Sequence, residues 1–573
     1  MKILFLSLIL LFISFSGFSR RTVVAAATEI NNTFWIAGDT IVMKNGTWIN
    51  QAISLRADGT VDQPIVLMAE SSGNVVLTGT SKMAFAGKYL VINGLYFKDG
   101  TLSGSDVISF RTSSSSLAEN CRVSNCVIEN YNPSLNTVDS KWVSIYGKNN
   151  QVDHCSFINK SNSGTLLVVW LVSGTTPNHI IADNYFGYRN ANLDSYGNEL
   201  NGQEIIRIGD SSTSMQEAGV RVTGNYFEHC NGEIEVISNK SCGNYYVNNI
   251  FFECAGMLTL RHGNNCTVDG NYFIGNGVAN TGGVRIIGEN HKVYNNYFEN
   301  LTGTGYRAAI CIVRGKENSA LNEYFQVKNA LVAFNTMVNC TQSFSINYNS
   351  SSLLNMPPIG TTIAHNHVYN ISSSKTNVII YLINVAAMDV SWKNNLMNQG
   401  LYTNFAYTAE QVITGVDPDM ALAGTTPEMY EPESGTGLMA YTTSDYSEID
   451  LDIRGRDRTS LKLPGASQTS GIESRIAPQK DSVGADFLRF PTYAIHNIKS
   501  NFLKVYSYRN QLITDVPVPG ELFIYDLMGR LISIQRISEG VTRNTISQNG
   551  IYIVIFKTKK DEKMSRKVVI CYN

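Results

Sequence analysis

The stretch VDGNYF, Val268–Phe273, has three close copies in the chain: VTGNYF from Val222, VNNIFF from Val247 and VYNNYF from Val293. The four copies begin 25, 21 and 25 residues apart, and each has an aliphatic residue, then polar or small residues, then an apolar pair. Self-similarity at a nearly constant period of this length is typical of stacked repeat architectures. Aligned at their first residues, the copies share one aromatic position, occupied by Phe227, Phe252, Phe273 and Phe298.

Looser copies extend this repeat from Val91 to Val368. The segments are short, alternate apolar with polar residues, and are separated by glycine and asparagine, which predicts strands joined by turns. Asparagine also tolerates left-handed backbone conformations and forms amide ladders between stacked strands. A β-propeller is the alternative, but its blades need four strands and roughly 40–50 residues. We therefore predict an all-β chain built on a right-handed parallel β-helix.

Composition narrows the classes of function. The chain has 573 residues and a formal net charge of −2, so no basic excess indicates a nucleic-acid partner. Its ten cysteines do not make a disulfide scaffold at this length, and they include no CxxC pair of the kind that binds zinc. Cys126 and Cys155 fall at equivalent positions of the repeat, and we expect them to belong to a column of small buried thiols.

The N-terminus has the pattern of a secretory signal peptide. One lysine precedes an apolar run from Ile3 to about Phe18, and small residues that suit cleavage follow at Ser19 and at Ala25–Ala27. The apolar run is too short to favour a membrane-spanning helix. We expect residues 1–27 to be the signal peptide, with cleavage between 19 and 27, and the mature protein to be secreted or held at the cell surface.

Charged residues recur on one predicted face of the repeat. Alternate side chains of a strand point to opposite faces, so Ile234 and Val236 are expected in the core, and Glu233 and Glu235 on the outer face. The same alternation turns three arginines outward: Arg207, Arg261 and Arg285. The sequence separations are 28 residues from Arg207 to Glu235, 26 from Glu235 to Arg261 and 24 from Arg261 to Arg285. Each separation is about one rung. We expect one column of charge on adjacent strands, which lie ~4.8 Å apart.

The two glutamates need a reason to lie side by side, because like charges on one strand face repel. Paired carboxylates with an amide oxygen suit a hard cation such as calcium, and Asn201, one rung earlier, has such an oxygen. Zinc would require histidine or cysteine at ligand spacing, which this region lacks. The alternative is a solvated charged face with incidental ion pairs.

Four motifs carry a family resemblance: NGQEIIRIGDSSTS from Asn201, NGEIEVISNKS from Asn231, LTLRHGNN from Leu258 and GGVRIIGENHKVYNNYFENLTGTGYRAAI from Gly282. They resemble the signatures of polysaccharide lyase family 6, which contains alginate lyases and chondroitinase B. The resemblance runs from GDTIVMKNGTW, which begins at Gly38, through Ile310, and more loosely to about Phe487.

The resemblance implies a parallel β-helix enzyme that cuts uronic-acid polymers by calcium-assisted β-elimination. It assigns the calcium ligands to Asn201, Glu233 and Glu235, the catalytic base to Lys240 and the catalytic acid to Arg261. It assigns the substrate groove to Arg207, His262, Arg285 and, one rung further on, Arg307. The base removes the proton on C5 of a uronate, beside a carboxylate that calcium neutralises. Arginine is a poor proton donor, so water or His262 can share the role of acid.

The resemblance favours alginate as the polymer. LTLRHGN and GGVRIIG are closer to the alginate lyases, and Arg285 fits that branch, whereas chondroitinase B lacks an arginine in the matching stretch. Dermatan sulfate is the second candidate. Two further classes stay open: a non-catalytic β-helix that binds glycans, and a glycoside hydrolase. A hydrolase needs two carboxylates on opposite sides of a bond, which Glu233 and Glu235 on one strand face do not offer.

The repeat fades past Ala421. We expect the catalytic β-helix over residues 28–420 and an end piece and linker over 421–494 that caps the last rung, since an open end exposes unpaired strand edges. LFIYDLMGRLISI, GIYIVIF and SRKVVICYN then predict a small β-sandwich over residues 495–573. This part resembles the C-terminal sorting domain of type IX secretion, which implies export through that machinery. We expect a monomer whose partners are the anionic polysaccharide and the secretion machinery, with no nucleic acid and no integral membrane segment.

Overall fold

The computed structural model describes residues 19–371, 377–382, 388–416, 420–423, 427–433 and 437–489, and in the C-terminal part 504–508, 511–516, 519–526, 531–538, 540–545, 550–558 and 563–570. Contacts divide the chain into two compact units, residues 1–490 and residues 491–573. Residues 1–18, which hold most of the predicted signal peptide, lie outside the described part. Among the described residues, no helix has the length and apolar character that crossing a membrane requires.

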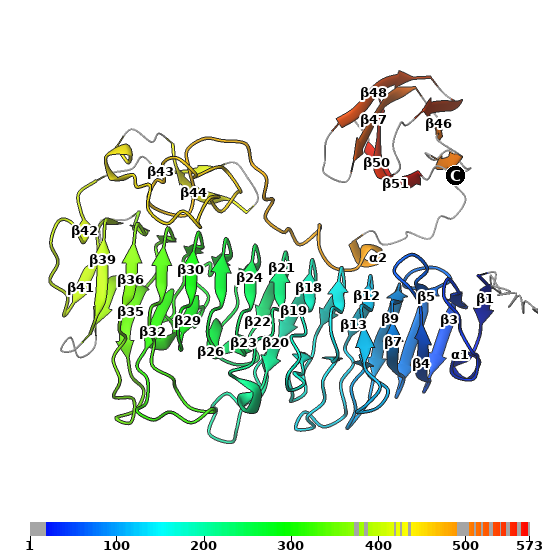
Figure 1. Cartoon of the computed structure of the whole chain (residues 1–573), viewed down its shortest axis with the longest axis horizontal. Coiled ribbons are helices and arrows are strands. Elements are labelled where there is room, and N and C mark those ends of the chain that lie inside the picture. The colour runs from blue at the N-terminus through cyan, green and yellow to red at the C-terminus, as the bar shows by residue number, and fades with distance from the viewer. Residues whose placement is uncertain are drawn as a thin grey trace, which may run out of the picture. The chain divides into compact units, whose positions relative to one another are not determined.

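The first unit is the predicted parallel β-helix. Three sheets of 14 strands each run along it, and successive rungs add one strand to each sheet (Figure 1). The first sheet contains β1 (Arg21–Val24), β2 (Thr40–Met43), β5 (Ile65–Ala69), β8 (Leu90–Asn93), β12 (Arg122–Ser124), β15 (Gln151–Asp153), β18 (Ile180–Ala182), β21 (Arg221–Thr223), β24 (Tyr245–Val247), β27 (Thr267–Asp269), β30 (Lys292–Tyr294), β33 (Leu331–Ala333), β36 (Thr361–Ala364) and β39 (Val390–Lys393).

The second sheet carries the candidate site. It contains β11 (Ala118–Glu119), β7 (Lys82–Lys88), β10 (Ile108–Ser109), β14 (Val143–Ile145), β17 (Leu167–Val169), β20 (Ile206–Gly209), β23 (Glu235–Lys240), β26 (Met257–His262), β29 (Val284–Ile286), β32 (Ile310–Val313), β35 (Gln342–Tyr348), β38 (Val378–Leu382) and β41 (Leu401–Thr403), with β4 (Ala52–Asp58) paired to β7.

The third sheet contains the strands that end the VDGNYF-type copies. They are β3 (Gly46–Ile49), β6 (Val75–Gly79), β9 (Leu95–Gly100), β13 (Val127–Glu129), β16 (Ser156–Ile158), β19 (Tyr185–Arg189), β22 (Tyr226–Cys230), β25 (Ile250–Phe252), β28 (Tyr272–Ile274), β31 (Tyr297–Glu299), β34 (Thr336–Val338), β37 (His367–Tyr369), β40 (Asn395–Met397) and β42 (Val412–Ile413).

A buried asparagine ladder marks the corner between the first and third sheets. Each side chain donates from Nδ2 to the Oδ1 atom of the next asparagine at 2.9–3.0 Å. The members are Asn184, Asn225, Asn249, Asn271, Asn296, Asn335, Asn366 and Asn395. The predicted amide ladder is therefore present, and it satisfies polar groups that burial would otherwise leave costly.

A phenylalanine stack lies beside the ladder, with ring centroids 4.6–5.1 Å apart. Its members are Phe157, Phe186, Phe227, Phe251, Phe273 and Phe298. The sequence alignment was wrong at one position, because Phe251 and not Phe252 pairs with Phe227 and Phe273. This copy of the repeat begins one residue earlier, at Tyr246, so Phe252 belongs to the outer face.

The cysteines follow the prediction. All nine in the described part are buried and free. Cys126 and Cys155 precede paired residues of β13 and β16, so they stack as predicted. Burial raises the pKa of Cys155 well above its usual range, which keeps the thiol neutral and unreactive.

Both ends of the β-helix need cover. At the first rung, helix α1 (Ala27–Asn31) packs on β4, and Ile30 and Trp35 join the core. We predicted that residues 421–494 cap the last rung. Leu438 and Leu463 pack with Leu396 and Ile413 of the last two strands of the third sheet. The described residues 427–433 and 437–489 also return along the outer side of that sheet (Figure 1). The return begins near the hairpin of β43 (Met420–Ala423) and β44 (Met429–Pro432) and ends at α2 (Asp486–Arg489), where Asp486 N–H donates to Asn125 Oδ1.

The third sheet explains this path. In the repeat copies, the residue before each stacked phenylalanine points outward and is itself apolar, as are Tyr226, Ile250, Tyr272 and Tyr297. Met429, Ile453, Ala466 and Ala477 of the return segment pack on this row. The apolar pair in each repeat therefore serves two faces, one in the core and one under the return segment.

The second unit contains two antiparallel sheets. One has three strands, β45 (Lys504–Tyr508), β46 (Gln511–Val516) and β49 (Gly540–Thr545). The other has four, β48 (Leu531–Ile537), β47 (Gly520–Asp526), β50 (Gly550–Thr558) and β51 (Lys563–Ile570). A separate apolar core, which includes Leu512, Leu522 and Phe556, fits the predicted small β-sandwich.

The ladder generates a stability prediction at Asn271. This side chain donates to Tyr246 O and Asn296 Oδ1 and accepts from the backbone and side-chain N–H groups of Asn249, all at 2.9–3.0 Å. Asn271→Ala leaves buried donors and acceptors unpaired, so we expect the free energy of unfolding to fall by about 3 kcal/mol or more. Chemical denaturation of the whole chain measures this loss.

The matched control is Asn136→Ala. Asn136 is exposed, and we expect a change within about 0.5 kcal/mol there. Equal losses for the two variants would show that the ladder contributes nothing specific.

Candidate active site

Four adjacent strands of the second sheet, β20, β23, β26 and β29, carry the candidate residues. Their core-facing side chains, including Ile206, Leu258 and Val284, are fully buried. The register places Arg207, Ser238, Thr259 and Arg285 side by side on consecutive strands. The expected single column of Arg207, Glu235, Arg261 and Arg285 is therefore wrong, since Glu235 pairs with Met257 instead.

A bulge in β23 causes the difference. The pairing with β26 shifts between Glu235 and Ile237, and both Val236 and Ile237 are buried in the core. A bulge inserts one unpaired residue and re-aims the side chains around it. Equal steps in sequence therefore do not give equal register here, although the charged residues still gather on this face.

Three buried glutamates form the centre of the site. Carboxylate oxygens of Glu204, Glu233 and Glu235 all lie within 4.8 Å of one another, and these residues are 2%, 5% and 8% exposed. The sequence analysis predicted Glu233 and Glu235 and missed Glu204. Glu204 precedes β20, so strand alternation did not orient it. It lies 31 residues before Glu235, as Ile206 lies 31 before its partner Ile237, and an alignment by rung would have found it.

The three carboxylates repel one another, and few neighbouring groups compensate their charge. Burial, with Glu204 and Glu235 nearby, raises the pKa of Glu233 to about 8. Glu233 Oε2 accepts from Gly202 N–H at 2.9 Å, and Glu204 Oε2 accepts from Thr165 Oγ1 at 2.6 Å. Glu235 accepts from Ser238 Oγ and from the Arg285 guanidinium. Three carboxylates without nitrogen or sulfur donors are the ligand chemistry of a hard cation.

Asn201 lies at the edge of this cluster. Its side chain is exposed, and its Oδ1 atom accepts from Gly202 N–H at 2.9 Å. The same N–H group donates to Glu233, so the amide oxygen and the carboxylate share one donor. The structure thus puts Asn201 beside the triad, and its role as a ligand stays a prediction.

Lys240, Arg261 and His262 meet at the ends of β23 and β26. Lys240 pairs in register with His262, and its Nζ atom lies 3.7 Å from Glu204 Oε1. The Arg261 guanidinium lies 4.2 Å from the centre of the Tyr324 ring and donates to Glu323 O at 2.8 Å. His262 Nε2 is 3.3 Å from Ser211 Oγ.

Charge and burial set the protonation of the histidine. Burial, with Arg261 and Lys240 nearby, lowers the pKa of His262 to about 3. The imidazole is therefore neutral near pH 7. Tyr324, which the sequence analysis missed, holds the guanidinium of Arg261 from a loop 63 residues further along the chain.

The remaining arginines lie around this centre. Arg207 stacks over Trp170 with 5.1 Å between the guanidinium carbon and the ring centre, and its buried Nε has no hydrogen-bond partner in the described part of the chain. Arg285 contacts Glu235 and lies 5.8 Å from the Tyr306 ring centre. Arg307 forms an ion pair with Glu199 at 2.8 Å. Aromatic residues thus orient two of the predicted groove arginines, a detail that strand alternation did not reveal.

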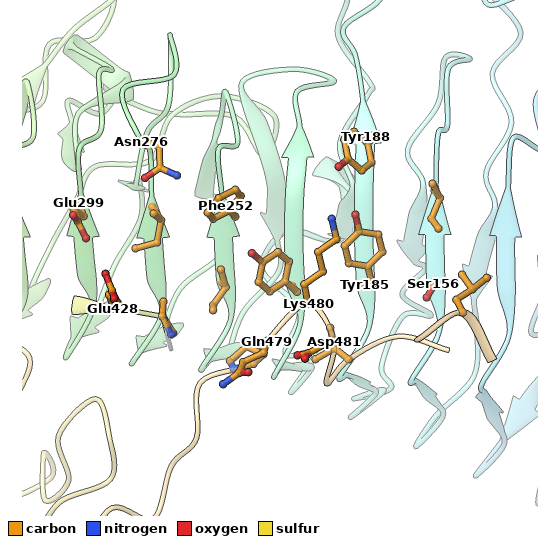
Figure 2. Close-up of a pocket in the computed structure, with 18 of the residues that line it drawn as sticks. Ser156, Tyr185, Tyr188, Phe252, Asn276, Glu299, Glu428, Gln479, Lys480 and Asp481 are labelled. Carbon is orange, nitrogen blue, oxygen red and sulfur yellow. The ribbon is translucent and has the colours of Figure 1, made fainter. Parts of the chain in front are cut away.

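A cavity of about 990 Å³ lies elsewhere, between the outer face of the third sheet and the return segment (Figure 2). Tyr185, Tyr188 and Phe252 line it, and its charged lining residues are Glu299, Glu428, Asp481 and Lys480. Three carboxylates against one ammonium do not suit a polyanion. The second sheet is therefore the better candidate for binding an anionic sugar.

Comparison with known proteins also indicates an enzyme family that acts on acidic polysaccharides. The sequence matches the family model described as Chondroitinase B over residues 24–445. Comparison with curated proteins gave no match. Among solved structures, the chain is similar to the alginate lyase AlyGC of family PL6 at 32% identity and TM-score 0.69, covering 81% of this chain. The match spans only 58% of the AlyGC chain.

Two further structures are similar over most of their own length. One is a mannuronic acid specific family 6 lyase from human gut microbiota, at 29% identity and TM-score 0.63, covering 70% of this chain and 92% of that one. The other is a family 6 polysaccharide lyase from Pseudopedobacter saltans, at 27% identity and TM-score 0.56, covering 69% and 94%. Because the family model spans well over half of the 573 residues, this chain belongs to the chondroitinase B family, polysaccharide lyase family 6.

Proposed function

We propose that this protein is a secreted lyase that cleaves alginate by β-elimination. The observation that carries the proposal is the meeting of Lys240 with Arg261 and His262 beside a buried cluster of three carboxylates. A cation held by those carboxylates, a basic nitrogen and a guanidinium are the groups that β-elimination on a uronate needs.

In the proposed reaction, Lys240 Nζ takes the proton from C5 of the uronate. The electron pair forms the C4–C5 double bond as the bond from C4 to the glycosidic oxygen breaks. Arg261 stabilises the negative charge that develops on the leaving oxygen, which then takes a proton from water or from the protonated Lys240. Since burial lowers the pKa of His262 to about 3, the neutral imidazole orients its neighbours and is no cationic acid near pH 7.

We assign the cation site to Glu204, Glu233 and Glu235, with Asn201 as a fourth oxygen donor. Calcium fits this set because it accepts several oxygen ligands in irregular geometry, and when bound it supplies neutralisation of the substrate carboxylate. Arg207 and Arg285, whose guanidinium groups are held by Trp170 and Tyr306, orient the remaining carboxylates of the polymer.

Alginate is preferred because the two most identical solved relatives described above are an alginate lyase and a mannuronic acid specific lyase. Dermatan sulfate is the second candidate, because the family model is described as Chondroitinase B. A non-catalytic glycan-binding role would give no purpose to Lys240 beside the carboxylate cluster.

We also propose export, with signal-peptide cleavage close to Ser19. Cleavage as late as Ala27 would remove β1, which pairs with β2 over four residues. It would also remove Arg20, whose guanidinium pairs with buried Asp39 at 2.5 Å. The second unit would then serve as the sorting domain of type IX secretion.

The substrate prediction is tested with polymannuronate, polyguluronate and dermatan sulfate. We expect ultraviolet absorbance of the unsaturated product to rise on at least one alginate polymer and to stay flat on dermatan sulfate. Absorbance on dermatan sulfate alone would transfer the assignment to the second candidate. No absorbance on any of the three with calcium present would end the lyase proposal.

The base is tested at Lys240. We expect Lys240→Ala to lower kcat by about 10²–10⁴-fold, the usual contribution of a positioned base. Lys240→Arg keeps the positive charge and removes the basic nitrogen, so it should be equally inactive if proton transfer is the role. The control is Lys292→Ala, on the first sheet, whose ion pair with Glu448 is exposed. Full activity of Lys240→Arg would show that the lysine acts only through its charge.

The cation site is tested by thermal unfolding with added calcium. Binding at a hundredfold excess over Kd stabilises the folded chain by about 2.7 kcal/mol, so the unfolding temperature should rise. We expect Glu233→Gln and Glu204→Gln to lose this rise. Glu228→Gln, a buried carboxylate on the third sheet that pairs with Lys480, should keep it. A rise that persists in Glu233→Gln would place the calcium elsewhere.

A further inference from the structure

The face that carries the candidate site continues toward the N-terminal end of the second sheet as a stack of flat groups. The Arg111 guanidinium carbon lies 3.8 Å from the centre of the Tyr146 ring. Tyr146 stacks on Trp170 at 6.0 Å with 8° between the ring planes, and Arg207 also lies over the Trp170 ring. The strands beneath these groups are β10, β14, β17 and β20, which are consecutive in the sheet.

Register confirms that the stack follows the sheet. Ser109, Ser144, Val168 and Arg207 pair in turn across these four strands. Three steps of ~4.8 Å separate Arg111 from Arg207 by about 14 Å along the β-helix, and β23, with the candidate base, is one step further. The stack therefore reaches from the candidate active site to a point well beyond one sugar ring.

A second cationic site lies at the far end of the stack. A cavity of about 350 Å³ opens beside Arg111, and its lining includes Lys82, Ser109, Thr112 and Ser113. Lys82 Nζ donates to Ser105 Oγ at 3.4 Å. The charged lining residues are Lys82, Arg111 and one carboxylate, Asp106, which leaves a net positive charge. Hydroxyl groups and cations together suit a sugar acid.

Arg111 differs from the arginines that hold the fold together. Two guanidinium nitrogens of Arg122 donate to the Asp153 carboxylate, and Arg456 forms ion pairs with both Asp452 and Glu431. In the described part of the chain, the Arg111 guanidinium makes no such ion pair or hydrogen bond, and it lies over the Tyr146 ring with the Asp106 carboxylate nearby. A guanidinium that lies over a ring, with its N–H groups unpaired, is prepared for a planar carboxylate.

We propose that Arg111 and Lys82 form a distal subsite that binds a carboxylate of the same uronate chain that Lys240 and Arg261 cleave. The proposal rests on the proposed function, because it takes the chain to be a uronate polymer. Tyr146 and Trp170 connect the distal subsite to Arg207 and support the guanidinium group at each end of the stack. The distal subsite makes binding depend on chain length, because only a long chain reaches both ends.

Steady-state kinetics on uronate oligomers of defined length test the proposal. For Arg111→Ala and for the double variant with Lys82→Ala, we expect KM to rise about tenfold on octasaccharides and polymer, the effect of about 1.4 kcal/mol of lost binding. KM on trisaccharides and kcat on all lengths should stay unchanged. Arg111→Lys should recover part of the loss, since it restores the charge without the fork.

The matched control is Arg221→Ala. Arg221 makes the same kind of contact, 4.9 Å over the Tyr245 ring, on the exposed face of the first sheet. Thermal unfolding of each variant reports any general damage to the fold. Equal losses on short and long chains, or no loss on polymer, would overturn the distal subsite.

A separate measurement keeps this result distinct from the proposed function. If the wild-type chain cleaves no uronate polymer, the proposed function fails, and equilibrium binding of mannuronate and guluronate octasaccharides still tests the subsite. Weaker octasaccharide binding by Arg111→Ala than by Arg221→Ala would support it. Equal binding by these two variants and the wild-type chain would refute it.

Discussion

The fixed spacing of about 4.8 Å between adjacent parallel strands is the constraint on which this structure depends. It places equivalent positions of successive rungs directly above one another, so the same residue type can stack along the molecule. The asparagine ladder satisfies its amides only because each side chain finds the next at 2.9–3.0 Å. The phenylalanine rings stack beside it for the same reason. The candidate site lies where the repeat is broken, on one face of one sheet.

The break consists of charge buried where repeated strands would place apolar or small groups. Glu204, Glu233 and Glu235 are each less than a tenth exposed, and burial raises the pKa of Glu233 to about 8. Taking several carboxylates out of water is costly unless they are paired or bind a metal. The remaining β-helix, with its long apolar core and satisfied ladder, offsets that cost. The bulge at Val236 provides the local geometry by turning Glu235 toward its partners.

Much of the fold could be predicted from the sequence, because period and alternation are local properties. The repeat predicted stacked parallel strands, the amide ladder and the buried thiols, and the structure has all three. The errors arose where register matters. Phe252 was predicted in the aromatic stack, where the structure has Phe251, and Glu235 was aligned with Arg207 because steps in sequence were taken as rungs. Bulges and loops of unequal length change register without changing the local pattern.

The candidate site shows the same limit. Motifs predicted Lys240, Arg261 and two of the three clustered glutamates, but Glu204 lies before its strand and Tyr324 in a distant loop. An alignment by rung would have found Glu204, whereas only the folded chain brings Tyr324 to the site. The path of the return segment also depends on long-range packing, since the outward tyrosines gave no indication of what would cover them.

The three sheets divide the surface in a way that suits a polymer. The return segment covers the apolar outer face of the third sheet, and the cavity of about 990 Å³ between them is lined by more carboxylates than cations. The second sheet carries Arg207, Arg261 and Arg285 at its centre, with Arg111 and Lys82 toward its N-terminal end. Because rungs repeat along the axis, groups added to successive strands of this sheet form a line. A linear polyanion laid along that line meets cations on several rungs at once, and local binding of each sugar acid then adds to that of its neighbours.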